Sequence, residues 1–234
     1  MTGYDSKYII RAAAHKSIVE DIEVIGPSSE KFNAIRVNKK LLFLDSYSFF
    51  HNSLDAMAKN MDKQSDYKLT RAFLNQYFDD KHIDMLLQKG IYPYEYFTSV
   101  SKYNETTLPP RECFFNQLTQ SPISDKDYEW AQTVWTTFNL QNLRQYTELY
   151  VTVDTLILAD VFQKMRGMFM NKFTLDPAHY YSVSQLSWDC FLKQTGIKLK
   201  YIKDPTLYLF LESSIRGGIS TGKYKNQVTN IFLL

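Results

Sequence analysis

Residues 143–170 constrain the fold of this chain most, because their pattern predicts one long helix. Tyr150 and Asp154 are four residues apart, so on a helix their side chains lie one above the other. The same face continues with the apolar residues Ile157, Leu158, Val161 and Met165. A carboxylate in a core-facing stripe costs free energy unless a partner or a metal ion compensates. The alternative is an ordinary amphipathic helix in which Asp154 turns to solvent or pairs with a lysine.

A second aspartate, Asp5, stands where a short helix is expected to begin, directly after Gly3 and Tyr4. The amino-terminal end of a helix suits an anion because its N–H groups and dipole point there. Two aspartates on two helices can converge on Mg²⁺, which prefers a few carboxylate oxygens and keeps its other positions for water and phosphate. Two such ions support phosphodiester hydrolysis, one activating water and the other stabilising the leaving oxygen. Tyr150 could position that water.

Several segments resemble the protein-primed family B DNA polymerases, the group found in phages, viruses, linear organellar plasmids and Maverick-type transposons. Residues 3–6, Gly-Tyr-Asp-Ser, are similar to the family's second exonuclease motif, and Tyr150-x-x-x-Asp154 is similar to the third. The similarity is closest to the transposon-like members and covers roughly residues 3–222 in the family's order. Further similar segments are residues 43–46, 53–54, 89–96, 108–110, 123–128, 175–181, 186–189 and 215–218.

The resemblance implies a helix-rich fold of the α/β to α+β class. Residues 1–175 would form part of a 3′–5′ exonuclease domain, with an incomplete ribonuclease H-like sheet, flanking helices and an irregular excursion over residues 98–122. Residues 176–234 would be a mostly helical, truncated start of the DNA polymerase domain. The implied activity is that of a DNA-directed DNA polymerase with a proofreading exonuclease.

The resemblance also assigns roles at the exonuclease site. Asp5 and Asp154 would hold two Mg²⁺ or Mn²⁺ ions, and Tyr150 would orient water. Lys89 resembles the lysine of a further family motif, where an ammonium group could neutralise charge on the scissile phosphate, although a surface lysine is an equal alternative.

Other positions would hold DNA. Ser53 and Leu54 resemble residues that contact a single-stranded primer end, and Ser53 is also a good helix N-cap, so that both roles can hold together. Tyr4 and Tyr8 would help to hold the strand end. Near the carboxyl end, a Gly-Gly motif allows close approach of a nucleic-acid backbone and an arginine can clamp phosphate. These residues are Arg216, Gly217 and Gly218.

Residues 21–25, 31–37 and 40–45 read as strands, the last two joined by a tight turn at Asn38 and Lys39. We expect the last of them to be a central strand. Asp21-Ile-Glu23 resembles the family's first exonuclease motif, but it follows Gly-Tyr-Asp instead of preceding it. We therefore expect Asp21 and Glu23 on the outward face, with Ile22, Val24 and Ile25 packing inward.

Helices are expected over residues 67–88, 124–138, 184–195 and 204–213. In the second of these, an aromatic and apolar stripe predicts a core-facing side. The stripe consists of Trp130, Val134, Trp135 and Phe138. Asp127-Tyr-Glu129 lies on the same helix and is a second false match to the first exonuclease motif.

The net charge of +2 is unevenly distributed. Residues 193–225 contain seven basic and two acidic residues, so the rest of the chain carries a net charge of −3. A basic segment beside an acidic site fits a protein that holds a phosphate backbone near metal ions, and a solvated surface is the alternative. The basic residues are Lys193, Lys198, Lys200, Lys203, Arg216, Lys223 and Lys225.

No run of 18 apolar residues and no signal segment is present, so we expect a soluble, intracellular protein without membrane contacts. Its compartment would be nuclear or cytoplasmic if it comes from a eukaryotic mobile element. Cys113 and Cys190 have no companions at ligand spacing, which indicates neither a disulfide framework nor a zinc site. The expected partner is DNA, as a single-stranded 3′ end or a primer–template, with a terminal priming protein as a further candidate.

The family's first exonuclease motif would lie before Met1, and its polymerase motifs would lie beyond Leu234. We therefore expect a fragment, from a partial gene or a decayed mobile element, which alone lacks polymerase activity and has little or no nuclease activity. Deoxynucleotides would bind only to the full-length parent. One alternative is a non-catalytic nucleic-acid-binding remnant. Another is a stand-alone nuclease, which needs an additional carboxylate such as Glu23 or Asp45 beside Asp5 and Asp154.

Overall fold

The computed structural model of the chain describes residues 5–14, 21–26, 34–117 and 120–215. It divides into two compact units, Met1–Phe191 and Leu192–Leu234, which we describe separately. The first unit contains a small sheet and a helical part that surrounds one long helix. The predicted helix-rich character is confirmed, and the small antiparallel sheet is consistent with part of an α/β domain.

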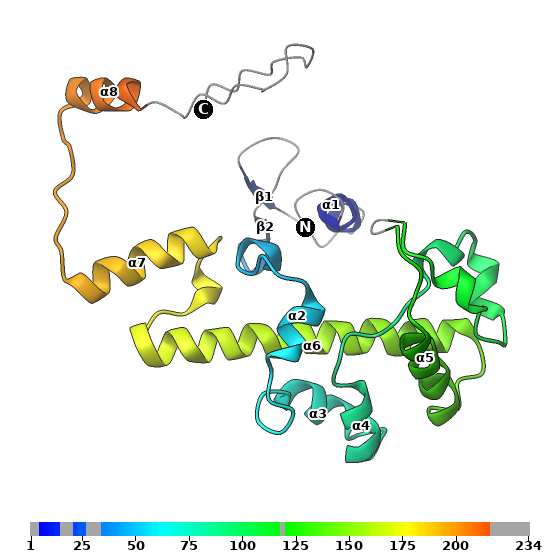
Figure 1. Cartoon of the computed structure of the whole chain (residues 1–234). Coiled ribbons are helices and arrows are strands. Elements are labelled where there is room, and N and C mark those ends of the chain that lie inside the picture. Colours follow the sequence, from blue (N-terminus) through cyan, green and yellow to red (C-terminus); the bar gives the residue numbers. More distant parts are fainter. Residues whose placement is uncertain (1–4, 15–20, 27–33, 118–119, 216–234) are drawn as a thin grey trace, which may run out of the picture. The chain divides into compact units, whose positions relative to one another are not determined.

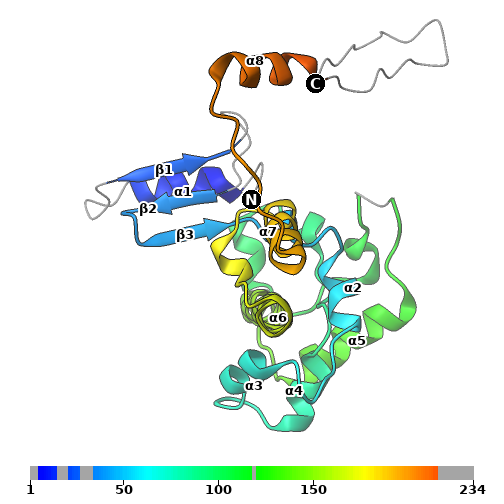
Figure 2. The ribbon, with the colours of Figure 1, turned by 90° about the vertical axis from the view of Figure 1, so that its left-hand side faces the viewer.

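The sheet has three antiparallel strands in the order β1-β2-β3, namely β1 (Ile22–Ile25), β2 (Ala34–Val37) and β3 (Leu41–Leu44). Figure 2 shows them side by side. The turn between β2 and β3 forms as predicted. Asn38 and Lys39 have φ of 50° and 56°, and the Lys40 N–H donates to the Val37 carbonyl at 3.1 Å. Left-handed conformation at two successive residues is the geometry of a type I′ hairpin turn.

Two details of the predicted sheet are wrong. Among the described strands β2 is the central one and β3 lies at an edge, because the chain runs as a simple meander. Val24 does not pack inward and is 40% exposed. Glu23 faces outward as expected, and its carboxylate pairs with the Arg36 guanidinium at 2.7 Å. Arg36 also donates to the Tyr181 hydroxyl at 3.0 Å, which ties β2 to the chain after the long helix.

The predicted long helix is α6 (Leu143–Phe173). It begins at Asn142, whose side chain accepts a hydrogen bond from the Gln145 N–H at 3.0 Å. It ends at Thr174, which has φ of 52° in the left-handed region. Figure 1 shows α6 as one continuous element. Among the segments that pack most closely on it are α2 (Leu54–Lys59), α3 (Lys68–Leu74) and the 3-10 helices η3 (Val100–Asn104) and η5 (Pro177–His179).

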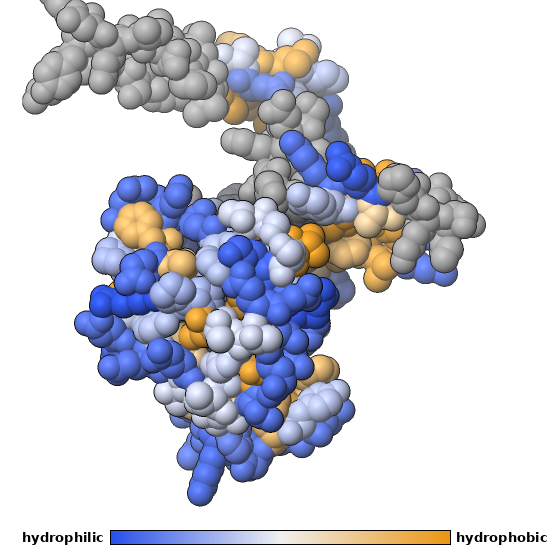
Figure 3. Space-filling model, turned by 90° about the vertical axis from the view of Figure 1, so that its right-hand side faces the viewer, coloured by the Kyte–Doolittle hydropathy of each residue, from blue (hydrophilic) through white to orange (hydrophobic). Residues whose placement is uncertain are grey.

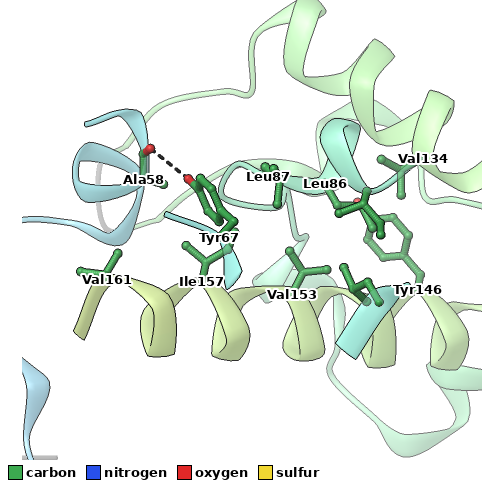
Figure 4. Packing of buried hydrophobic residues seen from close by; sticks show 11 residues of the cluster. Ala58, Tyr67, Leu86, Leu87, Val134, Tyr146, Val153, Ile157 and Val161 are labelled. Atoms are coloured by element: carbon green, nitrogen blue, oxygen red, sulfur yellow. Dashed lines mark hydrogen bonds between the residues drawn. The ribbon is translucent and has the colours of Figure 1, made fainter. Parts of the chain in front are cut away.

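The main core forms along one face of α6. Four of its side chains, Tyr146, Val153, Ile157 and Val161, point to the same side, where they meet residues from the preceding helices (Figure 4). The partners across this face are Ala58, Tyr67, Leu74, Ile83, Leu86, Leu87 and Val134. Residues spaced three and four apart on a helix share a face, so burial of this stripe accounts for the packing of α2 and α3 on α6.

Asp160 joins two helices from inside the core. Its side chain is 1% exposed and accepts hydrogen bonds from the Leu69 and Thr70 N–H groups, each at 2.9 Å, and from the Thr70 hydroxyl at 2.7 Å. These donors belong to the first turn of α3, and the N-cap residue Tyr67 supplies no side-chain hydrogen bond to that turn. A residue of α6 therefore caps α3.

A second cluster covers the carboxyl-terminal half of α6. It combines Phe49, Met165 and Tyr180 with Leu186 and Cys190 of α7 (Val183–Thr195), and partly buried Leu44 of β3 packs against it. The chain reverses direction just after α6, where the Arg166 guanidinium holds the Asp176 carboxylate through two hydrogen bonds of 2.9 and 2.6 Å.

The segment predicted as one helix over residues 67–88 is two helices, α3 and α4 (Asp80–Leu86). The second has its own N-cap, Asp79, which accepts a hydrogen bond from the His82 N–H at 2.9 Å. Residues 98–122 are irregular as predicted, with only η3, η4 (Arg111–Phe114) and one isolated bridge between Asn116 and Ser121 among the described residues.

The remaining helices agree with the predictions. α5 (Asp125–Thr137) starts at Ser124, whose hydroxyl accepts from the Asp127 N–H, and its aromatic stripe packs against the main core. Short elements occur at α1 (Asp5–Ala14), η1 (Ser46–Ser48) and η2 (Tyr94–Tyr96).

The second unit contains α8 (Pro205–Ser214), which is capped by Asp204 and exposes most of its apolar side chains.

Within the described ranges, no helix is both long and apolar enough to cross a membrane. The face shown in Figure 3 is mainly hydrophilic, with apolar patches separated by polar residues.

Candidate active site around Asp154

Asp154 lies on α6 with its carboxylate half-buried. The Gly90 N–H donates to Oδ1 at 3.4 Å. Burial raises the pKa of Asp154 above its ordinary value, while the Tyr150 phenol, the Gly90 N–H and the Lys89 ammonium act in the opposite direction on that pKa. A raised pKa means that the charged form is poorly compensated. The carboxylate is therefore suited to take up an additional cation.

Tyr150 lies one helical turn before Asp154 and is enclosed by two other tyrosines. Its ring stacks on Tyr92, with centroids 4.6 Å apart and planes at 22°, and its hydroxyl shares a hydrogen bond with the Tyr94 hydroxyl. Burial first, then the Tyr94 hydroxyl and the Asp154 charge, raise the pKa of Tyr150 above its ordinary value. Tyr150 therefore remains a neutral phenol, which can orient a water molecule but cannot act as a base.

The segment that carries Lys89 and Gly90 is held against α6 by hydroxyl contacts. The Tyr146 hydroxyl donates to the Ile91 carbonyl at 2.5 Å, and the Tyr92 hydroxyl lies 3.0 Å from the Thr147 hydroxyl. Burial raises the pKa of Tyr92 to about 12, so this ring is also neutral. Locally, the segment begins where α4 ends and turns at the buried Pro93. The structure thus brings Lys89, Tyr150 and Asp154 together.

A divalent metal ion fits the chemistry of Asp154, because Mg²⁺ prefers carboxylate oxygens and the burial of this group leaves its charge in need of a cation. In the part of the chain that the structure describes, however, no group of three or more His, Cys, Asp or Glu side chains is placed to hold a metal ion. Asp5 is the first residue of α1, and its side chain lies outside the described part. Of the two predicted ligands, only Asp154 can be placed.

A partly desolvated carboxylate beside a lysine and a neutral phenol is compatible with phosphodiester chemistry. A family model described as DNA polymerase type B, organellar and viral, matches residues 1–233. The chain belongs to this family. No curated protein and no solved structure matches the chain.

Membership in the organellar and viral type B DNA polymerases confirms that the chain belongs to a DNA polymerase family, as its sequence motifs implied. The family consists of DNA polymerases, which are nucleotidyltransferases that bind DNA and nucleotides and generally use divalent metal ions.

The residues predicted to hold DNA in this polymerase chain are spread over several elements. Ser53 is exposed and caps α2, because its hydroxyl accepts from the Ala56 N–H at 3.2 Å, which confirms its structural role. Leu54 is half-buried against the main core. Tyr8 lies on α1 and is 56% exposed. Tyr4, Arg216, Gly217 and Gly218 lie outside the described residues.

Two carboxylates could have completed a stand-alone nuclease site. Glu23 is exposed and paired with Arg36. Asp45 is 3% exposed at the end of β3, where its side chain accepts from the Tyr47 N–H at 3.0 Å. Neither belongs to a three-member group of metal ligands with Asp154 among the described residues.

Sequence reasoning did not identify two contributors to the site of this polymerase chain, Gly90 and Tyr94. The cluster of aromatic residues after Lys89 was the available signal, but which ring meets Tyr150 depends on how the segment docks on α6. It also did not identify Asp160, although an acidic residue three positions after the core residue Ile157 was a signal of the kind used for Asp154.

Proposed function

We propose that residues 1–175 contribute to a 3′–5′ proofreading exonuclease domain of a DNA-directed DNA polymerase, and that residues 176–234 lead into its polymerase domain. We further propose membership in the protein-primed, transposon-like group, with a priming protein as partner. The observation that carries the exonuclease proposal is the half-buried Asp154 with a raised pKa, beside the neutral Tyr150 and the Lys89 ammonium. The membership of the chain in a DNA polymerase family supports it.

In this proposal, Asp154 together with Asp5 would hold Mg²⁺ or Mn²⁺. The bound ions would supply an activated water molecule and stabilise the leaving oxygen of the phosphodiester. Tyr150 orients the attacking water, because its phenol stays protonated and its hydroxyl position is set by Tyr94. Lys89 compensates negative charge at the phosphate, as its ammonium already does for the Asp154 carboxylate.

The 3′ end of the DNA strand would be held by side chains outside this cluster. Ser53 is exposed at the start of α2, where a hydroxyl and N–H groups can meet a phosphate, and Leu54 follows as an apolar contact for a base. Tyr8, whose side chain is 56% exposed on α1, is a further proposed contact for the strand end. The remaining proposed contacts are Tyr4, Arg216, Gly217 and Gly218.

The test uses the complete product of the gene and a 5′-labelled single-stranded oligonucleotide with Mg²⁺. We expect stepwise shortening from the 3′ end, which is lost in Asp154→Ala. Extension of a primed template should continue in this variant, because polymerisation uses other residues. The matched control is Asp127→Ala on α5, an exposed carboxylate that lies in the false match to the first exonuclease motif. Equal shortening by Asp154→Ala and the unchanged protein would refute the assignment.

A second candidate is non-catalytic binding of nucleic acid by the second unit. Lys198, Lys200 and Lys203 are exposed there, and the Tyr201 side chain is 92% exposed between them. Basic residues with an interleaved aromatic ring suit a single-stranded backbone and its bases. Salt-sensitive binding of single-stranded DNA that survives Asp154→Ala but is lost on charge removal at these lysines would support this function. Binding that does not depend on these lysines would exclude it.

A further inference from the structure

We infer that Gly90 is a positioning residue of the exonuclease site, which sets the place of the Tyr150 ring and the orientation of the Asp154 carboxylate. This inference rests on the proposed exonuclease function for its catalytic consequence. Its structural part concerns three residues of one unit and can be tested without any activity.

The need for glycine at position 90 is steric. The backbone of Gly90 does not have the left-handed conformation that favours glycine, since Gly196 is the only glycine of the described part with positive φ. A Cβ atom at position 90 would lie 2.6 Å from Cδ2 and 3.0 Å from Cε2 of Tyr150. Carbon atoms that are not bonded to one another do not approach to 2.6 Å, so any side chain at position 90 requires the Tyr150 ring to move.

The Tyr150 ring cannot move aside without losing other contacts. Tyr92 stacks on it at 4.6 Å, and the Tyr94 hydroxyl is hydrogen-bonded to its hydroxyl. The partly open apolar pocket beside the ring, which Gly90 and Val153 help to line, has a volume of only about 20 Å³. That volume holds about one water molecule, so the ring cannot shift into this pocket. A methyl group at position 90 therefore shifts the Tyr150 hydroxyl from the site.

Gly90 also contacts the Asp154 carboxylate through its backbone N–H. Its amide nitrogen lies 3.4 Å from Oδ1 of Asp154. The same nitrogen is bonded to the Gly90 Cα atom, where an added side chain would meet the Tyr150 ring. A shift of this backbone therefore changes both the phenol that orients water and the carboxylate proposed to bind metal. One residue without a side chain thus positions two groups that come from a different element, α6.

The structural part is tested by a double-mutant cycle in thermal unfolding. Gly90→Ala should lower the melting temperature by roughly 5 °C, because overpacking a filled site is destabilising. In a Tyr150→Leu background, which removes the ring, the same substitution should have almost no effect. An equal loss in both backgrounds would overturn the inference, whether or not the exonuclease exists. The control is Gly167→Ala on α6, where an added Cβ meets nothing within 4 Å.

The catalytic part is tested in the complete gene product by 3′ shortening of single-stranded DNA. We expect Gly90→Ala to lower kcat on the order of 10²-fold with little change in KM, as for a misplaced catalytic group, and Gly167→Ala to leave both unchanged. In a Tyr150→Phe background, which keeps the ring and removes only the hydroxyl, Gly90→Ala should cause a smaller further loss, namely the part that acts through the Asp154 carboxylate. If Asp154→Ala abolishes shortening and Gly90→Ala does not lower kcat, the inference fails and the exonuclease stands. If Asp154→Ala has no effect, the exonuclease fails and the unfolding cycle alone decides the role of Gly90.

Discussion

Replacing Asp160 by alanine should destabilise this protein more than replacing any exposed aspartate. The carboxylate is almost completely buried and is the acceptor for three donors of α3, two N–H groups and one hydroxyl. Asp160→Ala leaves these donors without their acceptor, and the Thr70 groups are buried. It also removes the cap that joins α3 to α6.

The magnitude follows from the number of donors. Each buried donor that loses its partner costs about 1–3 kcal/mol, and the Leu69 N–H is only partly buried and can recover a bond to water. The alanine variant also avoids the desolvation of a charged group, which offsets part of the loss. We therefore expect a loss of about 4 kcal/mol in the free energy of unfolding, or roughly 10 °C in melting temperature for a chain of this size.

The assay is urea denaturation followed by far-ultraviolet circular dichroism. Asp160→Asn, which keeps one carbonyl oxygen as acceptor, should lose about half as much stability. The matched control is Asp55→Ala on α2, whose carboxylate is 44% exposed and pairs with Lys59, and which should lose less than about 1 kcal/mol. A loss for Asp160→Ala no larger than that for Asp55→Ala would refute the idea that this carboxylate caps α3.

Two further predictions concern acidic groups with shifted pKa values. The Arg166 guanidinium lowers the pKa of Asp176 to about 2, from an ordinary value of 3.8. Its folded-state pKa is depressed, so its stabilisation, on the order of 1 kcal/mol after solvent screening, is present above about pH 4 and is lost as the pH falls towards 2. Asp176→Asn should make the melting temperature depend less on pH between about pH 4 and pH 2. An unchanged slope of melting temperature against pH would contradict the pairing with Arg166. For Asp154 the folded-state pKa is raised, so stability is lost as the pH rises through it. Asp154→Asn should therefore be more stable than the unchanged protein at neutral pH without metal, whereas Mg²⁺ should raise the melting temperature of the unchanged protein only. Equal stabilisation of both by Mg²⁺ would place the ion elsewhere.

Features that depend on neighbouring residues were predictable from sequence. The helix α6, the turn at Asn38 and Lys39, the N-cap Ser53 and the start of a helix at about residue 124 all formed as expected. In each case the interacting groups are at most a few residues apart, so the pattern that predicts the element also contains the partner. The break between α3 and α4 was missed, because the apolar spacing continues across it and only the capping of Asp79 marks the new start.

By itself, the sequence determined the helical framework, the hairpin and the membership in the type B DNA polymerases. Only the tertiary structure decided that β2 is the central described strand, that Asp160 caps a helix ninety residues earlier, and that Tyr94 and Gly90 enclose Tyr150. The physical reason is that a hydrogen bond or a steric contact between remote segments leaves no periodic pattern in either segment. Such contacts exist only after the core along α6 has brought the segments together.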